Sequence, residues 1–92
     1  MSADKFFDGN EMMVIAATRY CIGRMTYIVG DCCDWLIKIW PMLSKNTQNI
    51  IQRDIEELFV RDDEDREDGR QYKALGHDCD RQQWERVRRM WQ

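Results

Sequence analysis

Apolar side chains recur along this chain at helical spacing, in four stretches separated by glycine, proline and charged residues. In the first stretch, residues 11 to 22, apolar positions cover so wide an arc that the helix should contact more than one neighbour. Gly23 then either separates two helices, which we favour, or lies inside one longer bent helix. Residues 26 to 40 leave only a narrow polar strip. Pro41 ends this second stretch, because a proline ring cannot continue helical hydrogen bonding. We predict one helix over 11–22, capped by Asp8 or Asn10, and a second over 26–40.

The second half of the chain shows two further helical patterns. Apolar residues at positions 51, 55, 58 and 59 predict a helix over about 45 to 62, with Ser44 as its cap. A last helix is predicted to start after Asp78 or Asp80 and to present Trp84 and Trp91 on one face. The prediction is therefore an all-α fold, a small bundle of three to four helices in which the helix over 26–40 is central.

The 92 residues suffice for one domain, which we expect to span the whole chain. Residues 1–9 are expected to form a flexible arm, and residues 62–78 an acidic loop. Within that loop Gly69 should end any helix, while Tyr72 and Leu75 should contact the core.

A formal net charge of −3 gives no overall attraction to nucleic acid, so direct nucleic-acid binding is not expected. The N-terminus lacks the pattern of a secretory signal. The longest apolar run is interrupted by Asp31, Asp34 and Lys38 and is shorter than a membrane span. We expect a cytoplasmic protein without a membrane segment, whose four cysteines are free thiols.

Metal and catalytic sites find little support in the residue pattern. The chain has no Cys-x-x-Cys pair, and its adjacent cysteines diverge by roughly 100° on a helix. The single histidine, His77, lies in a predicted loop close to Cys79, where the two side chains need not meet. The acidic run lacks the glycine and glutamate positions of a calcium loop. We expect no catalytic residues, no metal, no cofactor and no enzymatic activity.

The first candidate binding cluster lies around the Gly23 joint and comprises Arg19, Arg24, Thr26 and Tyr27. Arginines beside a helix N-terminus suit a phosphate or carboxylate. In the structural alternative, Arg19 or Arg24 pairs with Asp31, with Asp54 or with a neighbouring chain, while the tyrosines fill the core.

The second candidate is the acidic run that follows the third predicted helix. It is either a solvated charge run or a surface that engages a basic partner or imitates nucleic-acid phosphates. Its candidate partner-binding residues are Asp62, Asp63, Glu64, Asp65, Glu67 and Asp68. The arginines of the last helix could bind phosphates beside Trp84 and Trp91, but we favour core tryptophans with solvated arginines.

The run from Arg19 to Tyr27 is followed by Trp35, by Ser44 with an Ile/Asp/Glu-rich helix, by Asp78-Cys79-Asp80 and by Trp84-Glu85. This order resembles a group of small proteins encoded in phages and prophages, over roughly residues 15 to 60 and 78 to 88. The acidic run and the final arginine-rich turn depart from that pattern.

The resemblance implies a genomic setting in which small acidic proteins often inhibit host machinery stoichiometrically. Our leading hypothesis is a non-enzymatic, anti-defence inhibitor, similar to anti-CRISPR proteins, that binds a host protein or ribonucleoprotein. Two alternatives stay open: a nucleotide- or anion-binding module that uses the Arg19 to Tyr27 joint, and a dimeric assembly protein that pairs through the helix over 26–40.

Overall fold

The structure is a computed structural model that describes residues 9–22 and 26–92, without the side chains of Thr26 and Tyr27. In these residues the chain forms four α-helices and one short 3-10 helix: α1 (Glu11–Cys21), α2 (Thr26–Ile39), η2 (Trp40–Met42), α3 (Lys45–Glu67) and α4 (Asp78–Arg88). The all-α prediction is confirmed. Of the predicted arm over 1–9, residues 1–8 lie outside the described part of the chain.

The first two helices begin and end close to where the sequence predicts. Asn10 caps α1, because its side-chain oxygen accepts a hydrogen bond from the Met13 N–H at 3.3 Å. The α2 helix ends at Ile39, and Pro41 then falls within the 3-10 turn η2. Ser44 caps α3 by accepting a hydrogen bond from the Thr47 N–H at 3.3 Å, as predicted.

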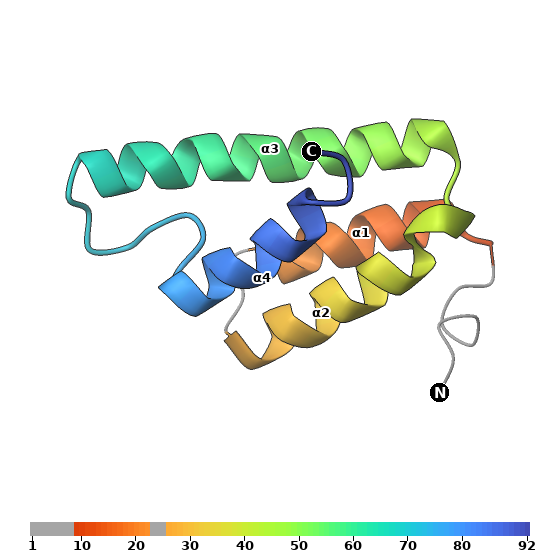
Figure 1. Ribbon diagram of the computed structural model, residues 1–92, viewed down its shortest axis with the longest axis horizontal. Coiled ribbons are helices and arrows are strands. Elements are labelled where there is room, and N and C mark those ends of the chain that lie inside the picture. Colours follow the sequence, from red (N-terminus) through yellow and green to blue (C-terminus); the bar gives the residue numbers. More distant parts are fainter. Residues whose placement is uncertain (1–8, 23–25) are drawn as a thin grey trace.

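The acidic run does not begin a loop, so the prediction of a loop from residue 62 is wrong for residues 62–67. The α3 helix continues through them to Glu67. Its end is set by Gly69, whose φ of +68° is a left-handed conformation that favours glycine after a helix. At 23 residues, α3 is roughly 34 Å long and runs along most of the 41 Å length of the molecule (Figure 1).

The segment between α3 and α4 folds back over the end of α3 (Figure 1). Leu75 is buried, as predicted, whereas Tyr72 is 84% exposed, and its predicted contact with the core is wrong. His77, rather than Asp78 or Asp80, precedes the first residue of α4, and its N–H donates to the Asp80 carboxylate at 3.2 Å. Gly76 has φ +70°, and a Cβ there would lie 2.8 Å from that carboxylate, so this turn requires glycine.

The helices pack pairwise: α2 contacts α1 and α4, and α3 contacts α1 and α4. Trp84 and Phe59 are the largest fully buried side chains. The α2 helix contributes more to the core than α1, which fits its predicted central place. The buried apolar residues are Val14, Cys21, Val29, Cys32, Cys33, Leu36, Ile39, Leu43, Ile51, Ile55, Leu58, Phe59, Leu75, Trp84 and Val87.

Candidate functional site

At the predicted Arg19 to Tyr27 cluster, the structure describes the side chain of Arg19 only. Arg24 and the side chains of Thr26 and Tyr27 lie outside the described residues. The Arg19 Nε atom lies 2.8 Å from Asp54 Oδ2 on α3, and this pairing raises the pKa of Arg19 above its ordinary value. Arg19 thus forms the internal ion pair of the structural alternative.

The residues of the acidic run differ in how deeply they are buried. Asp62 is fully buried, and its carboxylate accepts hydrogen bonds from Arg66 Nε at 2.7 Å, from the Leu75 N–H at 3.0 Å and from Arg81. Burial alone would raise the pKa of Asp62, but the hydrogen bonds from Arg66, Leu75 and Arg81 outweigh it and hold the pKa below its ordinary value. Asp62 therefore joins α3, α4 and the segment between them, and is closed to direct contact with a partner.

The other acids of the run lie nearer the surface. Asp65 accepts hydrogen bonds from the Ala74 N–H at 2.8 Å and from Arg70 at 3.2 Å, so it holds the segment that follows α3. Asp63 pairs with Arg81 at 2.9 Å and Asp68 with Arg70 at 3.5 Å, although both acids are exposed. Glu64 and Glu67 are exposed and form no ion pair with the described residues. Much of the acidic run thus balances nearby arginines.

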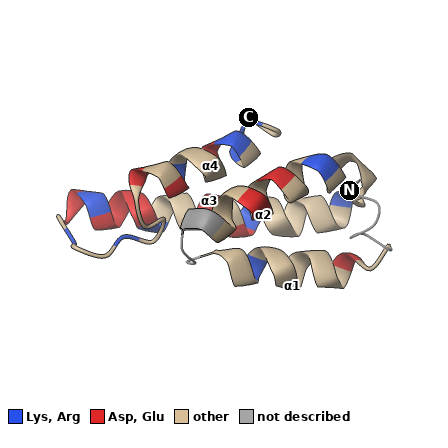
Figure 2. Ribbon diagram, turned by 90° about the horizontal axis from the view of Figure 1, so that it is seen from below, with Lys and Arg blue, Asp and Glu red and all other residues tan. Residues whose placement is uncertain are grey.

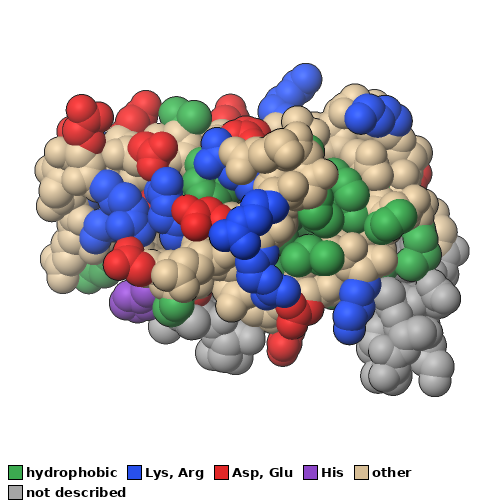
Figure 3. All heavy atoms as spheres, in the orientation of Figure 1, with side chains coloured by type: hydrophobic (Ala, Val, Ile, Leu, Met, Phe, Trp, Pro, Cys, Tyr) green, Lys and Arg blue, Asp and Glu red, His purple; other side chains and the backbone are tan. Residues whose placement is uncertain are grey.

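The arginines of α4 are mostly paired as well, which argues against a phosphate-binding helix. Arg88 contacts both oxygens of Glu56 at 3.0 Å, and Arg86 lies 2.7 Å from Asp34. Figure 3 shows blue and red side chains next to one another on this face of the molecule. The two tryptophans belong to the packing, since Trp84 is buried and the ring centroids of Trp91 and Trp40 lie 5.4 Å apart.

The cysteines have the properties of core residues. All four are free, and Cys21, Cys32 and Cys33 are buried. Burial raises the pKa of Cys32, and it raises that of Cys33 to about 12, so both remain protonated thiols at neutral pH. Among the described residues, no three His, Cys, Asp or Glu side chains are grouped so that they could hold a metal ion.

The outward face of α1 is the clearest exposed apolar surface. Met12 is 80%, Met13 62% and Tyr20 59% exposed, and Ala16 between them is exposed too. These four residues, which we call the α1 face, occupy positions i, i+1, i+4 and i+8 of one helix. Figure 2 shows α1 at the lower edge of the molecule, with few charged residues along it. Apolar surface gathered in this way marks interaction sites in monomers more often than scattered apolar residues do.

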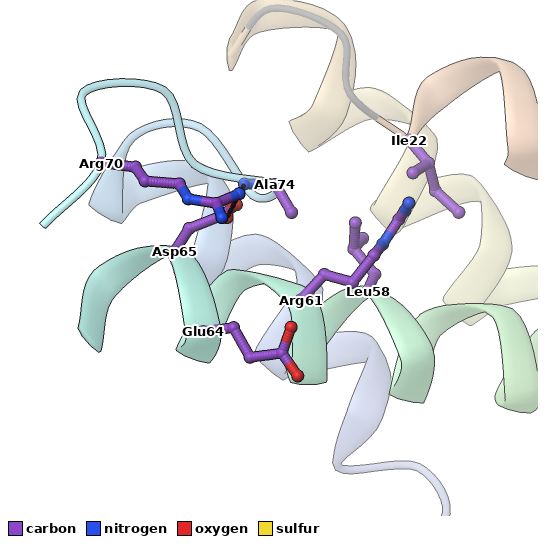
Figure 4. A pocket seen from close by; sticks show the side chains of 7 residues that line it. All are labelled: Ile22, Leu58, Arg61, Glu64, Asp65, Arg70 and Ala74. Carbon is purple, nitrogen blue, oxygen red and sulfur yellow. Dashed lines mark hydrogen bonds and ion pairs between the residues drawn. The ribbon is translucent and has the colours of Figure 1, made fainter. Parts of the chain in front are cut away.

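Beside this face, three adjoining hollows follow the line between α1 and α3, and we call them together the α1–α3 groove. The first, of about 350 Å³, is mainly apolar and is lined by Met12, Ile15, Ala16, Arg19 and Ile50. The second, of about 190 Å³, is lined by Arg19, Ile22, Asp54, Glu57 and Arg61. The third, of about 420 Å³, is lined by Ile22, Leu58, Arg61, Glu64, Asp65, Arg70 and Ala74, and is called the Arg61 hollow (Figure 4).

Arg61 differs from most arginines of the structure because it forms no ion pair or hydrogen bond with another described residue. Two acidic residues lie at spacings that allow ion pairs along a helix, Glu57 four residues before Arg61 and Glu64 three residues after it. Such surface pairs stabilise a helix by only about 0.2–0.5 kcal/mol. The Arg61 side chain instead extends from α3 beside Leu58 toward Ile22, at the end of α1 (Figure 4).

One feature of the sequence relates to the α1 face, namely the wide apolar arc over residues 11–22. By itself, a wide apolar arc indicates contact with several neighbours and does not indicate an exposed surface. The arc correctly implied more than one neighbour, and α1 does contact both α2 and α3. The α2 and α3 helices do not cover all of the apolar surface of α1, since four residues of this arc remain exposed: Met12, Met13, Ala16 and Tyr20. Nothing in the sequence singled out Arg61, which has acids at ordinary pairing distances along its helix.

No protein-family model, curated protein or solved structure matches this chain. Among the described helices, none combines the length and the hydropathy needed to cross a bilayer.

Proposed function

We propose that this protein is a non-enzymatic binding protein whose α1 face and α1–α3 groove hold an amphipathic helix of a partner protein. The exposed apolar face of α1 beside three adjoining hollows is the observation that carries the proposal. A groove between two helices suits a third helix, whose apolar residues recur at the same spacing as those of α1. Ala16 lies between Met12 and Tyr20 and, being small, allows the partner's backbone to approach closely.

The apolar content of this surface supports a protein partner. Burying an exposed methionine contributes about 1.5–3 kcal/mol. Burial of Met12, Met13 and Tyr20 by a partner would therefore stabilise a complex by several kcal/mol, without counting polar contacts. Methionine side chains are flexible and polarisable, so they adapt to a partner's surface.

The phage-protein resemblance favours a narrower form of this proposal. In that form the partner belongs to the defence machinery of a bacterial host, either a protein or a ribonucleoprotein, and the complex forms in the host cytosol. The exposed acids Asp63, Glu64, Glu67 and Asp68 would then meet basic groups at the edge of the same complex. The resemblance alone supports the choice of host partner.

A second copy of the chain is the alternative occupant. Met12, Ala16 and Tyr20 are evenly spaced about Ala16, so two antiparallel α1 helices could pair across a two-fold axis. A pair formed through α2 has less support, because Val29, Cys33 and Leu36 are buried within the single chain. Light scattering distinguishes the cases, since the partner-helix proposal expects a monomer when the protein is alone.

Replacing Met12 with glutamine should weaken partner binding roughly tenfold, which corresponds to about 1.4 kcal/mol of lost apolar burial. The free energy of unfolding should change by less than about 0.5 kcal/mol, because Met12 is exposed and glutamine is a good helix former. Val60→Gln is the matched control, since Val60 on α3 is also exposed and apolar but lines none of the three hollows. The measurement is calorimetric titration with the purified partner protein. Equal affinities of the Met12 variant and the wild type would contradict the proposal.

A further inference from the structure

The Arg61 hollow combines an apolar wall with a guanidinium group that has no partner among the described residues. The almost completely buried Leu58 lines it, together with the partly buried Ile22 and Ala74. Its volume of about 420 Å³ lies in the range of small-ligand sites. The hollow can therefore accept both an apolar group and a charged one.

The other charges of the hollow are already balanced, apart from Glu64. The two oxygens of Asp65 accept hydrogen bonds from Arg70 at 3.2 Å and from the Ala74 N–H at 2.8 Å. Arg70 also lies 3.5 Å from Asp68. Figure 4 shows Arg70 beside Asp65 on one side of the hollow, while Arg61 extends separately toward Ile22. Arg61 is thus the donor that remains for a ligand.

From this arrangement we infer that the Arg61 hollow binds a carboxylate carried on a short apolar chain. A guanidinium group matches a carboxylate because its parallel N–H groups can donate to both oxygens. The apolar chain would lie against Leu58, Ile22 and Ala74. This binding goes beyond the proposed partner complex, because it needs no partner protein.

A carboxylate fits the surroundings better than a phosphate does. Glu57 and Glu64 stand on either side of Arg61 along α3, and Asp65 also lines the hollow. Their repulsion of a ligand grows with the ligand's negative charge, so a doubly charged phosphate is repelled more than a singly charged carboxylate.

The bound carboxylate can come from one of two sources, a free carboxylic acid or an acidic side chain of a bound peptide. The test is an NMR titration of ¹⁵N-labelled full chain that follows the Arg61 Nε–Hε signal. One arm adds sodium hexanoate, a second adds N-acetyl-leucyl-glutamic acid α-amide, and a third adds inorganic phosphate. The Arg61 signal is identified by its loss in Arg61→Gln, in which the ligand-induced shifts of the Ile22 and Ala74 amides are then followed.

We expect a saturable shift with a dissociation constant on the order of millimolar. In Arg61→Gln the accompanying shifts of the Ile22 and Ala74 amides should be lost. Arg53→Gln is the control and should bind like the wild type, since Arg53 is an exposed α3 arginine that lines none of the three hollows. Saturation by hexanoate assigns the site to a free acid, and saturation by the peptide alone assigns it to an acidic side chain.

Two results would overturn the inference. One is the lack of saturation by either carboxylate at concentrations that would fill a millimolar site, and the other is phosphate binding as strong as that of hexanoate. Met12→Gln should leave the titration unchanged, because Met12 lies in the first hollow of the groove and not in the Arg61 hollow. The carboxylate site and the proposed partner face can therefore fail separately.

Discussion

Replacement of Asp62 with alanine should destabilise the protein by about 3 kcal/mol, at the lower end of what breaking a buried ion pair costs. The variant loses the acceptor for Arg66, Arg81 and the Leu75 N–H at once. The cost stays at the lower end because both arginines are partly exposed and keep other acidic partners, Asp78 for Arg66 and Asp63 for Arg81. Urea unfolding measures the change.

Two further variants at this cluster sharpen the test. Asp63→Ala removes an exposed acid that also contacts Arg81, and it should cost less than about 1 kcal/mol. Asp62→Asn keeps a polar side chain of the same shape and should fall between the wild type and alanine. If Asp62→Ala and Asp63→Ala were equally stable, the buried cluster would not be what joins α3 to α4.

The Asp62 cluster also predicts how stability depends on pH. The pKa of Asp62 is lower in the folded protein than its ordinary value of about 3.9 in the unfolded chain. Its contribution is therefore fully present above that unfolded value and is lost as the pH falls through the folded pKa. The stability advantage of the wild type over Asp62→Asn should be constant near neutral pH and shrink in acid. An advantage that stayed constant in acid would contradict this assignment.

Replacement of Trp84 with alanine should cost about 3–5 kcal/mol, because it empties a large volume in a closely packed core. This is a substantial part of the 5–15 kcal/mol that typically separates folded from unfolded domains. Trp84→Phe keeps much of the volume and should remain folded, so that a free energy of unfolding can be measured. Tyr72→Ala is the surface control and should change stability by less than about 0.5 kcal/mol. A Trp84→Ala variant as stable as the Tyr72 variant would show that α4 does not dock as described.

The helices could largely be predicted because their boundaries depend on local signals. Asn10 and Ser44 supply cap oxygens, and Pro41 interrupts the backbone hydrogen bonding. The sequence predicts too short an α3, because aspartate and glutamate usually lie in solvent and the acidic run therefore resembles a loop. Asp62 nevertheless continues the 51, 55, 58 spacing of the buried residues, and Arg66 stands four residues after it. A buried carboxylate can be predicted only when the residues that compensate its charge are known. For Asp62 one of these residues is Arg81, which lies on a different helix, α4, so the pair is not apparent from the sequence of α3.

The candidate site was harder to predict, since it depends on which apolar surface the fold leaves uncovered. Met13 and Tyr20 belong to the same apolar arc as Val14 and Cys21, yet only the latter two are buried. Which part of the arc faces inward is decided by the packing of α1 against α2 and α3. The pairing of Arg19 with Asp54 is among the alternatives that the sequence offers. That Arg61 has no ion pair with another described residue follows from side-chain positions, which the sequence does not reveal.

Site-specific photo-crosslinking tests the proposed binding face most directly. A photoreactive phenylalanine replaces Met13, a large exposed side chain of the α1 face, and the same group at Val60 serves as the control on α3. We predict that the Met13 probe crosslinks a partner polypeptide in a one-to-one complex, that Met12→Gln reduces the yield, and that the Val60 probe does not crosslink that partner. Crosslinking from Val60 with none from Met13, or equal yields with Met12 and with Met12→Gln, would contradict the proposed role of the α1 face.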